Sequence, residues 1–112
     1  MFMVFAEEAR KLRREADLSA AQIARATGAA TSTVNGWLGR RSEPTGARAE
    51  RIAELAAITE RLGLMMPKRH IPVWLSRPIE ALDDRCPLDL IAAGDYRLVA
   101  RAISAIEDPG AV

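Results

Sequence analysis

Few residues of this 112-residue chain belong to the types that carry out catalysis or bind metals. The chain has a single histidine, His70, and a single cysteine, Cys86. One of each can form neither a disulfide nor a tetrahedral zinc site within the chain. The sequence also shows no Ser/His/Asp arrangement and no pair of catalytic carboxylates. We therefore expect no enzymatic activity, no metal and no cofactor, and structural roles for His70 and Cys86.

The composition predicts a compact helical protein. Hydrophobic residues make up 49% of the chain and aromatic residues only 4%, and an alanine-rich, aromatic-poor chain favours closely packed helices. The net charge of +1 excludes a strongly basic nucleic-acid coat. No apolar stretch approaches the ~20 residues of a membrane helix. We expect a soluble protein with no membrane contact and, from the cysteine count, a cytoplasmic location.

The elements that must position any functional residue all have helical signals. Apolar residues recur at three- and four-residue spacing, for example at Phe5, Ala9, Leu12 and Ala16, and no segment alternates as a strand does. Gly and Pro separate the periodic segments, and we read Asp95 as the cap of the last one. The sequence predicts an all-α fold, with helices over residues 5–17, 19–28, 31–38, 47–62, 72–77, 87–94 and 96–106.

The fourth of these helices has apolar residues on more than one face. Ile52, Leu55, Thr59 and Leu62 line one side, and three alanines with Ile58 make much of the remainder apolar. A helix that is buried on two sides usually lies between two packing units. We therefore expect this helix to join an N-terminal region, residues 1–63, to a C-terminal region, residues 64–112.

Residues 19–39 have the spacing of a helix-turn-helix. Ser19 and Gln22 form a capping-box pattern, and Gly28 ends the first helix. A small residue, Ala24, precedes this glycine where two helices must cross, and Val34 and Trp37 follow it at positions that bury the second helix.

This stretch resembles the Xre/Cro-type regulators, in which the helix after the turn enters the major groove of DNA. The resemblance implies that exposed hydroxyl and amide groups of this helix contact base edges or phosphates. It also implies that the preceding helix, and two arginines that follow the second helix, contact the phosphate backbone of the DNA. The DNA-binding residues expected on this basis are Gln22, Thr31, Ser32, Thr33, Asn35, Arg40 and Arg41.

Three features depart from the usual pattern of these regulators. Ala29 follows the turn glycine, where a larger aliphatic residue is usual. Gly36 lies inside the recognition helix, at a cost of about 1 kcal/mol relative to alanine, and no basic residue precedes Arg40 in that helix. A helix-turn-helix that serves only as a scaffold or dimerisation platform therefore remains an alternative to DNA binding.

The C-terminal region carries a second motif. Val73-Trp74-Leu75-Ser76-Arg77-Pro78 is followed by Leu82, then by Cys86-Pro87-Leu88-Asp89-Leu90-Ile91, and then by Gly94-Asp95-Tyr96-Arg97-Leu98-Val99. Spacing alone indicates a small helical packing unit, with Trp74 in its core. The order of these residues is similar to the toxin-binding domain of the Xre/MbcA/ParS antitoxins. Together with the N-terminal half, the resemblance spans nearly the whole chain.

The resemblance implies an antitoxin that blocks the active site of a RES-domain toxin, an enzyme that consumes NAD or transfers ADP-ribose from it. We expect the last helix and the tail to enter the toxin's cleft, where Glu107, Asp108 and the terminal carboxylate of Val112 would take the place of the NAD phosphates. A frayed, solvated terminus is the alternative for the tail, and a solvated face for the two arginines of the last helix. The candidate toxin-binding residues are Arg97, Arg101, Glu107, Asp108, Pro109, Gly110, Ala111 and Val112.

The family resemblance further implies autoregulation and assembly. Two-fold operators require two helix-turn-helix units, so we expect a homodimer within a larger toxin–antitoxin hetero-oligomer, with operator DNA as a second partner. The apolar residues 1–5 are a candidate dimer contact. A stand-alone Xre-family transcriptional regulator without a toxin remains an alternative function.

Overall fold

The computed structural model describes residues 4–110, and within this range all regular structure is helical apart from one isolated antiparallel bridge between Ile79 and Arg85. Two short 3-10 helices, Lys68–His70 and Glu80–Leu82, were not predicted. The α-helices follow the predicted order to within about two residues at most ends. They are α1 (Val4–Ala16), α2 (Ala20–Thr27), α3 (Thr31–Leu38), α4 (Gly46–Gly63), α5 (Ile71–Ser76), α6 (Pro87–Ala92) and α7 (Tyr96–Glu107).

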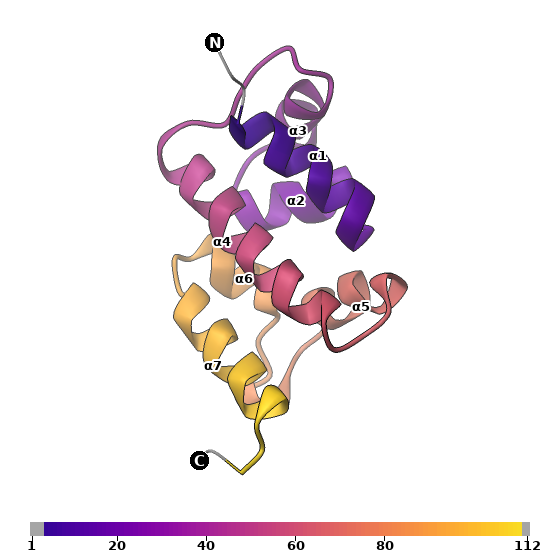
Figure 1. Ribbon diagram of the computed structural model, residues 1–112. Helices are drawn as coiled ribbons and strands as arrows, with labels where there is room; N and C mark the ends of the chain where they lie inside the picture. The colour runs from indigo at the N-terminus through magenta and orange to yellow at the C-terminus, as the bar shows by residue number, and fades with distance from the viewer. Residues whose placement is uncertain (1–3, 111–112) are drawn as a thin grey trace.

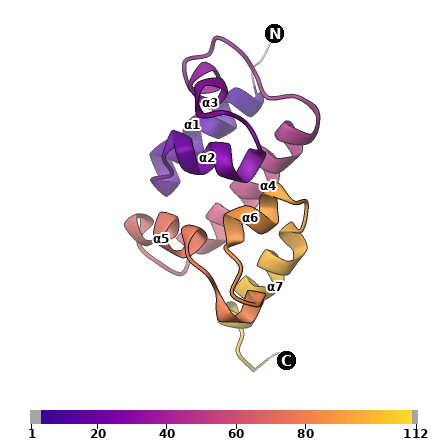
Figure 2. The same cartoon turned by 180° about the vertical axis from the view of Figure 1, so that it is seen from behind.

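The helices form an elongated molecule of 45 × 24 × 22 Å. Helices α1, α2 and α3 occupy one end and α7 reaches to the other, while the longest helix, α4, passes between them (Figure 1). Helix α4 packs against α1, α2, α5, α6 and α7. The view from behind shows α2 beside α6 (Figure 2), and these two helices are in extensive contact. The fold is therefore all-α, and α4 contacts helices of both predicted regions.

Local sequence signals explain where several helices begin and end. Ser19 accepts a hydrogen bond from the Gln22 backbone N–H, and the Gln22 side chain accepts one from the Ser19 N–H, which confirms the capping box. Gly28 adopts φ +72° in the left-handed region after α2, where glycine carries no steric penalty. Asp95 does occupy the cap position of α7, but its side chain makes no cap hydrogen bond. Capping by its carboxylate is thus not observed.

One continuous hydrophobic core extends through both halves of the chain. It contains residues of α1 to α4 together with residues of α5, α6 and α7, and both tryptophans, Trp37 and Trp74, are buried in it. Cores of this kind contribute most of the favourable free energy of folding through removal of apolar surface from water. The N- and C-terminal regions therefore stabilise each other.

Two details of the predicted core were wrong. Phe5 is 36% exposed, and Ala6, three residues before Ala9, faces the core in its place. On α4, Ile58 is buried as expected, but Ala53 and Ala57 are exposed, so one side of this helix faces solvent.

Candidate functional site

Helix α3 presents a polar face at its N-terminal end. Thr31, Ser32 and Asn35 are exposed and Thr33 is half-buried. Val34 on the opposite side is fully buried, as predicted. These four polar side chains thus lie where a recognition helix presents its base-contacting groups, although their contact with DNA remains a prediction.

Gly36 allows the chain after α3 to pack tightly against the helix. A Cβ atom at this position would lie 2.8 Å from the Ser42 side-chain oxygen. The Gly36 carbonyl also accepts a hydrogen bond of 2.9 Å from the Arg41 backbone N–H. This close approach gives the glycine a packing role that the sequence did not reveal.

The two arginines after α3 are exposed, and both make contacts inside the chain. Arg40, with φ +58°, donates from Nη2 to Glu7 Oε2 at 3.0 Å. Arg41 donates from Nη2 to the Asn35 carbonyl at 3.2 Å. Both guanidinium groups are at the surface and would have to share or exchange these partners to reach a phosphate.

Gln22 lies against the C-terminal region rather than at a free surface. Its Nε2 donates to Ser76 Oγ at 2.7 Å and to the Pro72 carbonyl at 3.3 Å, while its Oε1 accepts from the Ser19 N–H. Both ends of the amide are therefore engaged, which works against the expected contact with a DNA phosphate. The contact itself remains a prediction.

A second bond between α2 and the C-terminal region was not anticipated. Arg25 donates from Nε and Nη2 to the two carboxylate oxygens of Asp89, both at 2.7 Å. These paired hydrogen bonds lower the pKa of the Asp89 carboxyl and raise the pKa of the Arg25 guanidinium. The two residues are 64 positions apart, so no local pattern in the sequence pairs them.

The end of α7 is anchored to α4. Arg61 donates to the Glu107 carboxylate, to Ser104 Oγ at 2.9 Å and to the Ala100 carbonyl at 3.4 Å. The hydrogen bonds from Arg61 lower the pKa of the Glu107 carboxyl. Glu107 is therefore already paired with a cation, and it would have to leave Arg61 before it could mimic a phosphate in another protein.

The remaining candidate toxin-binding residues are at the surface where the structure describes them. Arg97 and Arg101 are exposed on α7, and neither makes an ion pair with a residue in the range 4–110. Asp108, Pro109 and Gly110 are exposed beyond the helix. Ala111 and Val112, with its terminal carboxylate, lie outside the described residues, as do residues 1–3 of the candidate dimer contact.

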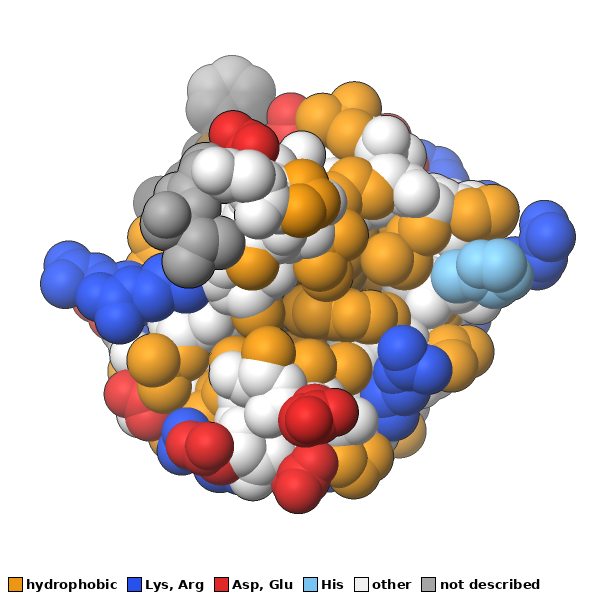
Figure 3. Space-filling model, turned by 90° about the horizontal axis from the view of Figure 1, so that it is seen from below, with side chains coloured by type: hydrophobic (Ala, Val, Ile, Leu, Met, Phe, Trp, Pro, Cys, Tyr) orange, Lys and Arg blue, Asp and Glu red, His pale blue; other side chains and the backbone are white. Residues whose placement is uncertain are grey.

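Hydrophobic side chains gather on the face of the molecule at the end that carries the C-terminus of α7. Viewed from below, they form a broad area across the middle of this face, with charged groups around it (Figure 3). Ile106, near the end of α7, is 49% exposed. An apolar area with a charged rim is typical of a protein-binding surface.

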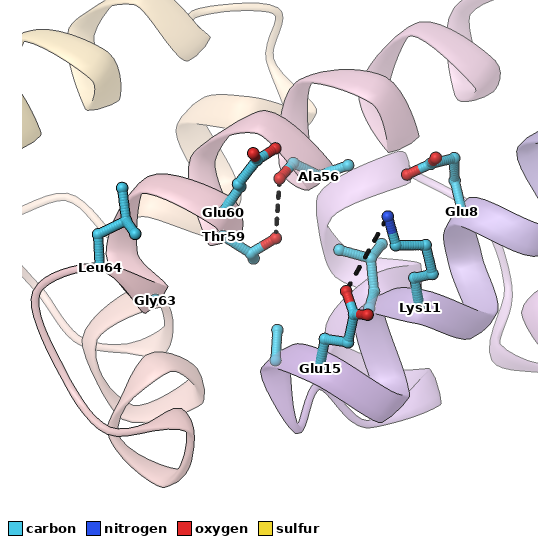
Figure 4. A pocket seen from close by; sticks show the side chains of 10 residues that line it. Glu8, Lys11, Glu15, Ala56, Thr59, Glu60, Gly63 and Leu64 are labelled. Carbon is cyan, nitrogen blue, oxygen red and sulfur yellow. Dashed lines mark hydrogen bonds and ion pairs between the residues drawn. The ribbon is translucent and has the colours of Figure 1, made fainter.

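A cleft of about 400 Å³ lies between α1 and α4. Glu8, Lys11 and Glu15 line it from α1, and Thr59 and Glu60 from α4 (Figure 4). Lys11 Nζ lies 4.0 Å from Glu15 Oε2, and the Thr59 hydroxyl donates to the Ala56 carbonyl of its own helix at 3.0 Å. This set offers no activated nucleophile beside a general base.

The single histidine and the single cysteine do not form part of a common site. His70 is exposed, so burial does not support the structural role expected for it. Cys86 is half-buried, and its Sγ lies 3.4 Å from the Ser76 carbonyl. Within residues 4–110, no group of three potential metal-ligating side chains comes together, and none of the helices in that range has the length and hydropathy needed to cross a bilayer.

Comparison with known proteins assigns this arrangement. Residues 68–108 match the model of the antitoxin Xre/MbcA/ParS C-terminal toxin-binding domain. This segment of the chain is therefore similar to the toxin-binding domain of that antitoxin family. It contains α5, α6 and α7 and falls within the predicted C-terminal region.

Two kinds of relatives agree with this assignment. The mycobacterial cidal antitoxins MbcA of Mycobacterium bovis and Mycobacterium tuberculosis are 29% identical over 80 residues, which cover 71% of this chain and 71% of each relative. A chain in the crystal structure of the M. tuberculosis MbcT–MbcA toxin–antitoxin complex superposes with a TM-score of 0.82 at 25% identity. The superposition covers 97% of the present chain and 98% of the chain in that complex. The similarity thus includes the helix-turn-helix half as well as the toxin-binding domain.

Proposed function

We propose that this chain neutralises a cognate toxin by binding it through the C-terminal region. The observation that carries the proposal is the match of residues 68–108 to a toxin-binding domain, on a chain that superposes over nearly its full length with a component of a toxin–antitoxin complex. We further propose that the toxin is a cytoplasmic RES-domain enzyme that degrades NAD or transfers ADP-ribose from it, and that the antitoxin blocks its active site.

The end of the molecule that carries the last turn of α7 is the best candidate for the contact. Ile106 exposes apolar surface there, and the exposed residues 108–110 continue from the helix. Burial of such surface would contribute about 25 cal/mol per Å² to binding. The tail would then enter the cleft of the toxin, while Arg97 and Arg101 meet acidic groups beside it.

Co-expression tests this proposal directly. The antitoxin and the product of the adjacent gene should co-purify, and growth of cells that express that product alone should be arrested and then restored by the antitoxin. Intracellular NAD should fall during the arrest if the toxin consumes it. If the two proteins do not associate, or if the antitoxin gives no rescue, the proposal is wrong.

We also propose that a dimer of the antitoxin binds its own operator. The exposed Thr31, Ser32 and Asn35 at the start of α3 support this second function, since short polar side chains can read base edges in the major groove. A gel-shift assay with the DNA upstream of the gene tests it, with the antitoxin alone and with its toxin. Failure to shift this DNA in either form would favour a scaffold role for the helix-turn-helix.

A further inference from the structure

A cluster of arginines surrounds the C-terminal end of α3, and most of its charge comes from α1. Arg10, Arg13 and Arg14 lie at positions i, i+3 and i+4 of α1, on one side of that helix, and together with Leu38 they line a shallow depression. Helices α1 and α3 are in contact at the same end of the molecule (Figure 1). We call the arginine surface the group formed by Arg10, Arg13, Arg14, Arg40 and Arg41.

Two members of the arginine surface cap the end of α3. Arg10 donates from Nη1 to the Leu38 carbonyl at 3.3 Å, and Arg41 donates from Nη2 to the Asn35 carbonyl at 3.2 Å. Cations at this position complement the negative end of the helix dipole. These two hydrogen bonds fix the arginine surface relative to the recognition helix.

The arginine surface is far from neutralised. Glu7 is shared among three guanidinium groups, at 3.0 Å from Arg40, 3.7 Å from Arg14 and 3.8 Å from Arg10. Arg13 is exposed and makes no ion pair with any residue of the described range.

Glu43, in the loop after α3, accepts a hydrogen bond from the Phe5 N–H at 3.2 Å. Five arginines against two glutamates give the area a net charge of +3, whereas the whole chain carries only +1. Positive charge is therefore concentrated at the end of the molecule that carries α3.

We propose that the arginine surface binds backbone phosphates of duplex DNA beside the groove that receives α3. The inference rests on the proposed operator binding and extends it to α1, for which the sequence predicted no role at the DNA. It also supplies the basic groups that are missing from α3 itself. Arginine suits this role, because its planar guanidinium can donate two parallel hydrogen bonds to one phosphate.

The dimensions of α3 agree with this arrangement. Eight residues at a rise of about 1.5 Å each make α3 about 12 Å long, which is close to the width of the major groove of B-DNA, about 12 Å. With the N-terminal end of α3 at the base edges, its C-terminal end comes near the backbone of the same duplex. The arginine surface lies at that C-terminal end.

Salt-dependent binding of the full-length antitoxin to DNA tests the inference. Affinity for a fluorescently labelled upstream duplex, measured between 50 and 200 mM salt (roughly the range over which the effect of phosphate binding is most visible), should fall in the double variant Arg13→Gln, Arg14→Gln. The slope of log K against log salt should decrease by about 1 for each phosphate that the variant no longer neutralises. An unrelated duplex should show the same decrease, because phosphates carry no sequence information.

Two controls separate a specific surface from a change in net charge. The double variant Arg13→Lys, Arg14→Lys should keep most of the salt slope, because lysine still neutralises phosphates. Arg77→Gln removes an exposed arginine that follows α5 and should leave affinity and slope unchanged. Melting temperatures close to that of the wild type would establish that all variants are folded, since Arg13 has no ion-pair partner among the described residues and Arg14 is only loosely paired with Glu7.

Each outcome decides between the two proposals. If the wild type binds no duplex, either alone or together with its toxin, operator binding and the arginine surface are both overturned. If the wild type binds the upstream duplex and the glutamine variant keeps the full slope, the arginine surface is overturned while operator binding stands. A decrease in Arg77→Gln half as large as that in the glutamine double variant would also overturn the arginine surface, since every removed charge would then have the same effect wherever it lies.

Discussion

The pair formed by Arg25 and Asp89 connects the two functional halves at the level of single residues. It spans α2 and α6 with two hydrogen bonds of 2.7 Å. Both side chains are more than one-third exposed, so solvent screening limits the contribution of the pair to stability to about 0.2–1 kcal/mol. Together with the hydrogen bonds from Gln22 to Ser76 and Pro72, it joins α2 to the segment that matches the toxin-binding domain.

The pH dependence of stability should reveal this pair. Because Arg25 lowers the pKa of Asp89 in the folded state, the stabilisation is present above the pKa of the unfolded chain and is lost as the pH falls through the lowered pKa. We expect the melting temperature of the wild type to fall more on acidification than that of Asp89→Asn. Thermal melts followed by circular dichroism from neutral to acidic pH would measure the difference. Parallel pH curves for the two proteins would contradict the prediction.

Gly36 and Ser42 offer a test at the scale of helix α3. Alanine at position 36 should gain up to about 1 kcal/mol in helix propensity, but its Cβ would meet the Ser42 Oγ at 2.8 Å. We therefore expect Gly36→Ala to stabilise the protein more in a Ser42→Ala background than in the wild type. A double-mutant cycle in urea would give the coupling free energy. A coupling of zero would show that the serine side chain rotates away without cost.

The last turn of α7 and the tail form the element whose deletion tests the mode of inhibition. Removal of residues 107–112 should abolish or strongly reduce neutralisation of the toxin, because the segment proposed to enter its cleft is then missing. The control is Glu107→Gln, which weakens the interaction with Arg61 and retains the tail. Growth rescue by each variant, at equal expression level, is the measurement. Undiminished rescue by the truncated protein would rule out a plug formed by the tail.

The sequence predicted the helical elements well because the signals for them are local. Ser19 with Gln22, Gly28 and Pro87 each mark a helix end through their own backbone preferences, and the structure confirms these ends. The short 3-10 helix at Lys68–His70 has no apolar periodicity and was missed. Phe5 was wrongly expected in the core. Apolar spacing predicts which face of a helix is buried, but it does not predict whether other elements cover that face at the end of the helix.

The candidate sites were harder to predict, because they depend on interactions between distant residues. The Arg61–Glu107 pair joins residues 46 positions apart, and Gln22 reaches Ser76 across 54 positions. A single sequence contains no record of such pairs. Family resemblance supplied the toxin-binding domain, which the comparisons confirm, whereas the individual binding residues remain predictions.

At the scale of the whole molecule, the continuous core predicts that both halves unfold together. Trp37 lies in the N-terminal region and Trp74 in the C-terminal region, and both are buried. The variants Trp37→Phe and Trp74→Phe leave one reporter in each half. We expect the fluorescence transition of each variant in urea to coincide with its own circular dichroism transition. Two separated transitions within one variant would show that the halves are independently stable.

The interactions of α2 also decide how antitoxins of this kind can be recombined. Gln22 and Arg25 bind partners in α5 and α6. In a chimeric protein made from two relatives and joined at Gly63, α2 of one relative would therefore pack against α5 and α6 of the other. An exchange of toxin preference between relatives should therefore succeed only when the contacting residues of α2 are exchanged together with the C-terminal helices. The same linkage implies that evolution cannot exchange one half of this molecule freely without adjusting the other.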